Sequence, residues 1–181
     1  MKTRERILVN SLELFNTLGE PHVTTLDICN EMEISPGNLY YHYKGKDEII
    51  AELFARFEED MQELQGNVFE EEVTVLEVWM YMQLSFEAIA RFQFIYRDLT
   101  DLMSRYPILQ RRFKRLLKAQ QATIKNLCAA LQLNQALQTS EADLQRIAEH
   151  IVMTMSFWLN FEQIQWAEKT PFVANVEECA Y

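Results

Sequence analysis

The stretch TTLDICNEMEISPGNLYYHYKGKDEII, residues 24–50, predicts two short helices joined by a tight turn. Thr24 is a suitable N-cap for the first helix, and Asp27 stands three residues later, as in a capping box with Asp in place of the usual Glu. Ser35 is a suitable N-cap for the second helix, and Pro36 occupies its first position, where a missing N–H removes no hydrogen bond. Two short helices behind a longer first helix make a helix-turn-helix arrangement.

The second short helix is expected to run over residues 36–43 and to present a face that fits a DNA major groove. At about 100° per residue, Leu39 and Tyr43 point toward the other helices. The opposite face is small, flat and rich in hydrogen-bonding groups, and it consists of Gly37, Asn38 and Tyr41, flanked by Tyr40 and His42. Glycine allows the backbone to approach closely, asparagine offers a donor and an acceptor to a base edge, and tyrosine offers ring contact and a hydroxyl.

Groups beside this face are expected to bind the phosphates of the duplex. His42 and Lys46 can donate to phosphates on one side. Thr24, Thr25 and the N-terminus of the first short helix can do so on the other side. In the alternative interpretation the aromatic side chains only cover the helix, which is what we expect of Tyr43 but not of the outward-facing side chains.

The composition indicates an all-α fold. The chain has 181 residues, 49% of them apolar, and only four Gly and four Pro, which are too few turn residues for a β-sandwich. Beyond the quoted stretch, the expected helices cover residues 3–18, a segment that starts near Asp47, and 73–91, 93–104, 107–133 and 140–167. We expect an N-terminal three-helix domain over residues 1–46 and a C-terminal helical bundle over residues 47–181.

Several classes of protein are not indicated by the sequence. No apolar run is long enough to span a membrane. The three cysteines, Cys29, Cys128 and Cys179, form no CxxC or metal-binding pattern, which favours a reducing, cytoplasmic location. A Gly-rich phosphate loop, an HExxH motif and a nucleophile motif are also missing. We therefore expect no cofactor, no metal site and no enzymatic activity.

The charge of the chain is an objection to a nucleic-acid partner. The formal net charge is -10, whereas DNA-binding domains usually carry a basic surface. Residues 1–50 contain five basic and eight acidic side chains, so local placement has to supply the positive face. The five basic residues stand at the chain start and around the second short helix: Lys2, Arg4, Arg6, Lys44 and Lys46. We expect modest non-specific affinity for DNA and a shallow salt dependence.

Residues 3 to about 54 resemble the DNA-binding domain of TetR-family transcriptional regulators. The resemblance rests on the paired threonines, the Ser-x-x-x-Leu-Tyr run, the Tyr-His-aromatic sequence that follows, and the Lys-Asp/Glu pair that opens the fourth helix. It implies an all-helical dimer that reads a palindromic operator, with a C-terminal bundle for ligand binding and dimerisation. The DNA contacts that it implies are Thr25, Ser35, Asn38, Tyr40, Tyr41, His42 and Lys46.

The chain departs from the family pattern at three places. Met32-Glu33 stands where a small Ala-Gly pair is common before the turn, which bears on the geometry of the turn. Asn38 stands where Thr is frequent, which bears on operator sequence, and Tyr43 replaces the usual Phe. Family members also commonly continue through another helix after the point where this sequence stops, and its last residues, NVEECAY, look like the start of a helix.

The C-terminal half is dense in aromatic residues and methionines at helical spacing. Most of these are expected to be core, although large adaptable side chains can also enclose an apolar cavity. The candidate effector-binding residues are Trp79, Met82, Phe86, Phe94, Met103, Phe113, Phe157 and Trp158. The favoured effector is a small hydrophobic or amphipathic molecule, such as an acyl chain or an aromatic compound.

Two further surfaces are indicated in this half. The basic run over residues 111–118 is a solvated face, a partner for the acidic 58–72 region of a second subunit, or a site for an anionic head group. The segment 140–167 is expected to form the dimer contact through an apolar face made of Ile147, Ile151, Met155, Trp158 and Phe161.

The leading hypothesis is a ligand-responsive, DNA-binding transcriptional repressor. Its expected partners are a double-stranded DNA operator, a second copy of the chain and a small-molecule effector, with no membrane partner. The alternative is a helical protein-interaction module with no DNA role, in which the helix-turn-helix serves packing only.

Overall fold

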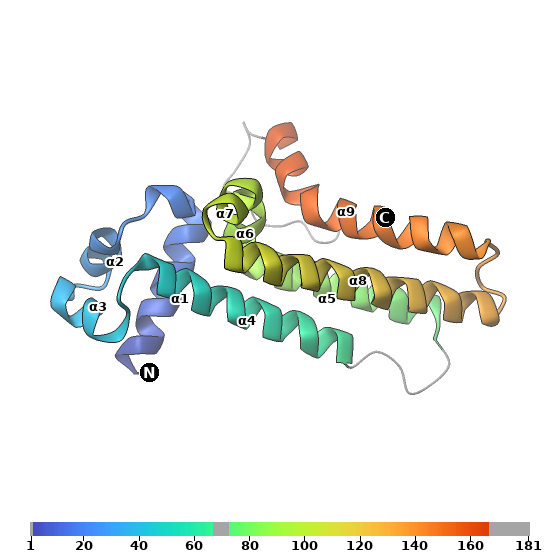
Figure 1. Cartoon of the computed structure of the whole chain (residues 1–181), viewed down its shortest axis with the longest axis horizontal. Helices are drawn as coiled ribbons and strands as arrows, with labels where there is room; N and C mark the ends of the chain where they lie inside the picture. Colours follow the sequence, from blue (N-terminus) through green and yellow to red (C-terminus); the bar gives the residue numbers. More distant parts are fainter. Residues whose placement is uncertain (1, 67–72, 167–181) are drawn as a thin grey trace.

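In the computed structural model, residues 2–66 and 73–166 are described, and within these ranges the chain is all-α, with no strand (Figure 1). The N-terminal elements are α1 (Thr3–Leu18), the 3₁₀ turn η1 (Glu20–His22), α2 (Thr25–Glu31) and α3 (Pro36–His42). The remaining helices are α4 (Lys46–Gly66), α5 (Val75–Arg91), α6 (Gln93–Arg97), α7 (Leu99–Arg105), α8 (Pro107–Leu133) and α9 (Glu141–Trp166). The expectation of an all-helical fold with an N-terminal helix-turn-helix is confirmed.

The two short helices begin at the capping residues that the sequence predicts. The Thr24 hydroxyl accepts a hydrogen bond from the Asp27 backbone N–H at 3.2 Å, and Asp27 accepts one from the Thr24 N–H at 2.8 Å, which completes the capping box. At the start of α3 the Ser35 hydroxyl accepts a hydrogen bond from the Asn38 N–H at 3.2 Å. These bonds satisfy N–H groups that a helix leaves unpaired at its first turn.

The turn between α2 and α3 keeps its geometry without the usual glycine. Glu33 has φ of 53°, in the left-handed region that favours glycine. Its N–H donates to the Asn30 carbonyl at 3.2 Å, and the Ile34 N–H donates to the Cys29 carbonyl at 3.0 Å. This pair of bonds is a Schellman motif, which ends α2 and turns the chain toward α3. The Met32-Glu33 departure therefore leaves the path of the turn intact.

The helix expected over residues 93–104 is instead two helices, α6 and α7, separated at Asp98, and this expectation was wrong. Asp98 has ψ of 26°, outside helical values. Residues 94–96 of α6 are all buried, because this short helix packs against both α1 and α9. The break also places α7 as a separate short helix beside α8.

The C-terminal bundle is formed by long helices that lie side by side (Figure 1). Helix α4 runs out of the helix-turn-helix unit and packs against α5 and α8, and α8 packs along α9. At the centre, the Phe57 ring lies 5.7 Å from the Phe92 ring and 5.7 Å from the Tyr96 ring, and Tyr96 lies 5.7 Å from Phe113. Rings at these distances and tilts contribute beyond their buried area.

Two other sequence expectations concern cysteines and membranes. Cys29 and Cys128 are free and buried, as expected of small core residues, and Cys179 lies outside the described residues. No helix in the described ranges has the length and apolar character that crossing a membrane requires.

Candidate nucleic-acid interface

Helix α3 turns the face predicted for DNA toward solvent. Leu39 and Tyr43 are buried, with 0% and 1% of their surfaces exposed. Tyr41 is 81% exposed, and Gly37 and Asn38 are exposed beside it. The predicted orientation of this helix is therefore confirmed, while the DNA-contacting role of the residues stays a prediction.

The flanks of α3 bring several of the predicted contact residues together. The Tyr40 hydroxyl lies 3.4 Å from the Thr25 hydroxyl, so two polar groups from α3 and α2 meet at one edge. At the other edge the His42 ring meets the Tyr41 ring edge-on, with 5.0 Å between their centroids. Thr24 stands next to Thr25, at the start of α2. The hydroxyl and imidazole groups therefore border the exposed face on both sides.

Ser35 and Thr24 are exposed, but their hydroxyl oxygens are already engaged. Each hydroxyl accepts a hydrogen bond from a backbone N–H in the first turn of its helix. A hydroxyl has a donor as well as two acceptor lone pairs. The Thr24 donor is directed to Asp27 at 2.6 Å, whereas Ser35 keeps its donor for another acceptor. Of these two residues, Ser35 is the better placed to donate to a phosphate.

The tyrosine that replaces the usual phenylalanine at position 43 has a structural partner. The Arg4 guanidinium donates a hydrogen bond to the Tyr43 hydroxyl at 3.2 Å, and it also lies over the Tyr43 ring at 5.2 Å. Burial raises the pKa of the Tyr43 phenol, so the group stays neutral and accepts this bond. Arg4 is further held by Glu52 at 2.5 Å. The hydroxyl therefore fastens α1 to the end of α3.

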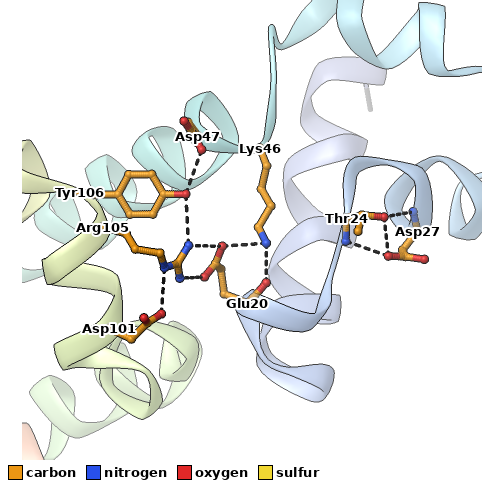
Figure 2. A network of polar contacts seen from close by, with 8 residues as sticks. All are labelled: Glu20, Thr24, Asp27, Lys46, Asp47, Asp101, Arg105 and Tyr106. Carbon is orange, nitrogen blue, oxygen red and sulfur yellow. Dashed lines mark hydrogen bonds and ion pairs between the residues drawn. The ribbon is translucent and has the colours of Figure 1, made fainter.

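Lys46 is held inside the protein by Glu20. The Lys46 ammonium lies 2.6 Å from the Glu20 backbone carbonyl oxygen and 2.8 Å from its carboxylate (Figure 2). An ammonium has three donors, so one is left for an outside acceptor. The sequence contained no signal for this pairing, because the two residues are far apart in the chain and Glu20 stands in a linker of no recognised pattern.

The basic residues around α3 divide into paired and unpaired groups. Arg4 and Lys46 form ion pairs, with Glu52 and Glu20 respectively. Lys2, Arg6 and Lys44 form no ion pair with any residue in the described part of the chain, and all three are exposed. Three of the five cations around α3 are thus unpaired within the described residues, fewer than the count in the sequence suggested.

The candidate effector-binding residues differ in burial. Phe86, Phe94, Met103 and Phe113 are buried, and Met82 and Trp158 are partly buried. Trp79 is 43% exposed and Phe157 is 49% exposed, so these two lie on outer surfaces and not within the bundle. Phe94 packs on Phe15 of α1 at 5.4 Å, which places it at the junction between α6 and the N-terminal unit.

The basic run over residues 111–118 is mostly solvated. Arg112 is the exception, because it donates to Glu58 of the same chain at 2.8 Å. Arg111, Lys114, Arg115 and Lys118 are exposed. Arg112 therefore fastens α8 to α4 within one subunit. Among the described residues, no cluster of His, Cys, Asp and Glu could hold a metal ion.

A helix-turn-helix that exposes its second short helix, attached to a helical bundle, is an arrangement found in DNA-binding transcriptional regulators. Residues 7–53 match the family model for bacterial regulatory proteins of the tetR family, and residues 56–181 match the TetR model for a bacterial transcriptional repressor. The chain belongs to the TetR family. It is accordingly a regulator and not an enzyme.

Solved structures of other proteins have a similar fold. A TetR-family transcriptional regulator from Marinobacter aquaeolei is 28% identical, with a TM-score of 0.85 over 99% of this chain and 85% of that chain. The TetR-family regulator PfmR from Thermus thermophilus is 18% identical, with a TM-score of 0.72 over 97% of this chain and 92% of that chain. The ketosteroid transcriptional regulator KstR2 of Mycobacterium tuberculosis is 18% identical, with a TM-score of 0.68 over 99% of this chain and 89% of that chain. No curated protein matches the chain.

Proposed function

We propose that the protein is a cytoplasmic repressor that binds a palindromic operator as a homodimer and leaves it when a small hydrophobic or amphipathic effector binds. The observation that carries the DNA-binding part is the exposed face of α3. Tyr41, Asn38 and Gly37 are open to solvent, while Leu39 and Tyr43, on the opposite side of the helix, are buried in the core. Apart from its edge-on contact with His42, the Tyr41 ring is open to solvent, where a base edge or a phosphate could contact it.

Base and phosphate contacts on this face divide by chemistry. The Asn38 amide offers a donor and an acceptor, as base-edge recognition requires. The Tyr40 and Thr25 hydroxyls, the Ser35 hydroxyl, His42 and the remaining Lys46 donor border the face and suit phosphate oxygens. We assign operator sequence chiefly to Asn38 and Tyr41.

The homodimer is assigned to the exposed apolar side of α9. Four large side chains that are between 49% and 83% exposed recur there at helical spacing, and they are Met153, Phe157, Phe161 and Ile164. This stripe is turned away from the side that packs on α8, where Met155 is 2% exposed. Met155 therefore belongs to the subunit core, and Ile147, Ile151 and Trp158 are partly buried against that core. Of the five residues predicted for the dimer contact, Phe161 lies in the exposed stripe, and Phe157 joins it there.

The amphipathic character of the effector is supported by polar groups inside the bundle. The Trp158 indole N–H is buried and has no hydrogen-bond partner among the described residues. The Tyr81 phenol is also buried, which raises its pKa, and hydrogen bonding to the Ser85, Thr123 and Gln65 side chains lowers it in part. A buried polar group without a partner is costly, so an effector with a polar end would be held there.

The proposal is tested by DNA binding in vitro. The wild-type protein is incubated with the promoter region beside its own gene, and the bound fraction is measured by gel shift. Tyr41→Ala is expected to weaken binding by about 1–3 kcal/mol, the range of one good base contact. Tyr41→Phe keeps the ring and is expected to lose less. Wild-type protein that binds this DNA no better than an unrelated duplex, or Tyr41→Ala protein that binds as well as wild type, would falsify the assignment.

A further inference from the structure

A buried carboxylate lies where the helix-turn-helix unit meets the C-terminal bundle (Figure 2). Glu20, in η1, is 0% exposed, and two cations reach it from opposite sides. Lys46 comes from the first position of α4, on the DNA-binding side. Arg105 comes from the last position of α7, on the bundle side, and forms a two-point ion pair with the Glu20 carboxylate. The Glu20 carboxylate therefore pairs both with Lys46, a predicted phosphate contact, and with Arg105 of the C-terminal bundle.

Arg105 is held in place by the bundle and not by Glu20 alone. Asp101, one turn earlier in α7, accepts a hydrogen bond from the Arg105 Nε at 2.9 Å. The Tyr106 ring lies 5.2 Å from the guanidinium, and its hydroxyl donates to Asp47 of α4 at 2.9 Å. Leu102, on the inner side of α7, is fully buried against the bundle. The position of Arg105 therefore follows the position of α7.

We propose that Glu20 and Arg105 are positioning residues for DNA binding, which together set how much of the Lys46 charge is available to an operator phosphate. This inference rests on the proposed DNA-binding role of the α3 face. When Arg105 is docked, it neutralises Glu20, and Lys46 can direct its remaining donor and its charge outward. When α7 carries Arg105 away, Lys46 is the one cation among the described residues that still pairs with Glu20. Because an unpaired buried carboxylate is costly, Lys46 then stays bound to it and offers less charge to a phosphate.

The sign of the coupling follows from this arrangement. Docking of Arg105 favours operator binding, and any effector that moves α7 away from η1 weakens it. The two ligands are then linked through one ion cluster, as a coupling free energy between sites requires.

The junction also contains a matched arginine that makes no contact with Lys46. Arg97, at the end of α6, donates to the Asn16 carbonyl at 3.0 Å and to the Phe15 carbonyl at 3.1 Å. Both carbonyls belong to α1. Arg97 therefore fastens the same two halves of the protein through backbone groups, and it serves as the control for a purely structural effect.

The experiment is a double-mutant cycle on full-length protein. Wild type is compared with three single variants, Lys46→Gln, Arg105→Gln and Arg97→Gln. It is also compared with two double variants, in which Lys46→Gln is combined with Arg105→Gln or with Arg97→Gln. Binding is measured by fluorescence anisotropy at several salt concentrations, with the duplex that the wild-type protein selects from a random-sequence library. Circular dichroism and thermal unfolding establish that each variant is folded.

The expected results are specific to a role that acts through Lys46. Lys46→Gln and Arg105→Gln each weaken binding about tenfold and each lower the magnitude of the salt slope by about 0.9 per subunit, the value for one phosphate contact. The Lys46→Gln/Arg105→Gln double variant is no weaker than either single variant. Arg105→Lys keeps the charge and restores the slope. Arg97→Gln leaves the slope unchanged, and its effect on affinity adds to that of Lys46→Gln.

Other outcomes overturn the inference. Additive losses from Arg105→Gln and Lys46→Gln, or an unchanged salt slope in Arg105→Gln, would show that Arg105 acts on structure alone. Failure of the wild-type protein to select any duplex would instead reject the proposed function, and the coupling with it. Selection by wild type together with additive losses rejects the coupling only.

A second variant, Asp101→Asn, tests the inference if the Arg105→Gln protein does not fold. Asp101 is 57% exposed, so Asp101→Asn is not expected to disturb the fold. It removes one of the groups that hold Arg105 in place, and it should lower operator affinity about twofold when Lys46 is present. In the Lys46→Gln background this loss should vanish. A loss of equal size in both backgrounds, or a gain in affinity, would overturn the inference.

Discussion

The helix-turn-helix unit and the C-terminal bundle are held together by contacts of different range. In the N-terminal unit, each short helix starts at a hydroxyl that bonds a backbone N–H three residues away, as Thr24 and Ser35 do. In the bundle, the central contacts are rings from α4, α6 and α8 that are brought together only by the tertiary fold, such as Phe57, Tyr96 and Phe113. Contacts between residues a few positions apart can be predicted from the sequence, whereas packing between distant residues is known only from the structure.

The largest effect expected from this comparison is in the ring cluster. Phe57→Ala removes a fully buried ring that contacts Phe92 and Tyr96, and it should lower the free energy of unfolding by about 3–5 kcal/mol. Urea unfolding followed by circular dichroism measures the change. Tyr41→Ala removes a ring of similar size from the exposed face of α3 and should change stability by less than about 0.5 kcal/mol. Equal losses in the two variants would contradict the contrast between the regions.

The predictable features of the fold are those that depend on short-range contacts. The caps at Thr24 and Ser35 and the outward direction of Tyr41 all depend on residues within one or two turns, and all are confirmed. The break at Asp98 was missed because the apolar residues on both sides suit a single helix, and only packing against α1 and α9 divides them.

The sites divide in the same way. The face of α3 could be predicted because a single helix carries it. Glu20 was missed because its importance comes from Lys46 and Arg105, whose positions the tertiary fold decides. Trp79 and Phe157 were assigned to an interior because aromatic residues at helical spacing look alike whether they face a core or a partner. An interior site formed by several helices leaves no periodic signal of its own.

An intermediate effect is expected at the capping box of α2. Thr24→Ala removes the acceptor for the Asp27 N–H and should lower the free energy of unfolding by about 1 kcal/mol. The matched control is Thr154→Ala, at an exposed position in the middle of α9, where the hydroxyl donates to the His150 carbonyl. There alanine is the better helix former and should stabilise by a few tenths of a kcal/mol, roughly. Thermal unfolding of both variants measures the two signs, and a loss of similar size at both positions would mean that the cap contributes nothing special.

The smallest effect, and a gain, is expected at two turns that end helices without glycine. Glu33 after α2 and Gln135 after α8 have φ of 53° and 60°. Each is followed by a residue whose N–H closes the turn: Ile34 donates to Cys29 at 3.0 Å, and Ala136 donates to Leu131 at 2.9 Å. A left-handed conformation costs an L-residue about 1–2 kcal/mol, and glycine avoids that cost while losing roughly 0.5–1 kcal/mol through its freer unfolded chain.

Glu33→Gly and Gln135→Gly should therefore each stabilise the protein by about 0.5 kcal/mol, measured by urea unfolding. Because both side chains are exposed, little packing is lost at either position. Only Glu33→Gly removes a negative charge beside the predicted DNA-binding face, so it alone should also tighten operator binding by a small factor that high salt abolishes. Destabilisation by Glu33→Gly with stabilisation by Gln135→Gly would mean that the glutamate fixes the turn before α3 by a contact of its own, and that the N-terminal unit depends on more than its caps.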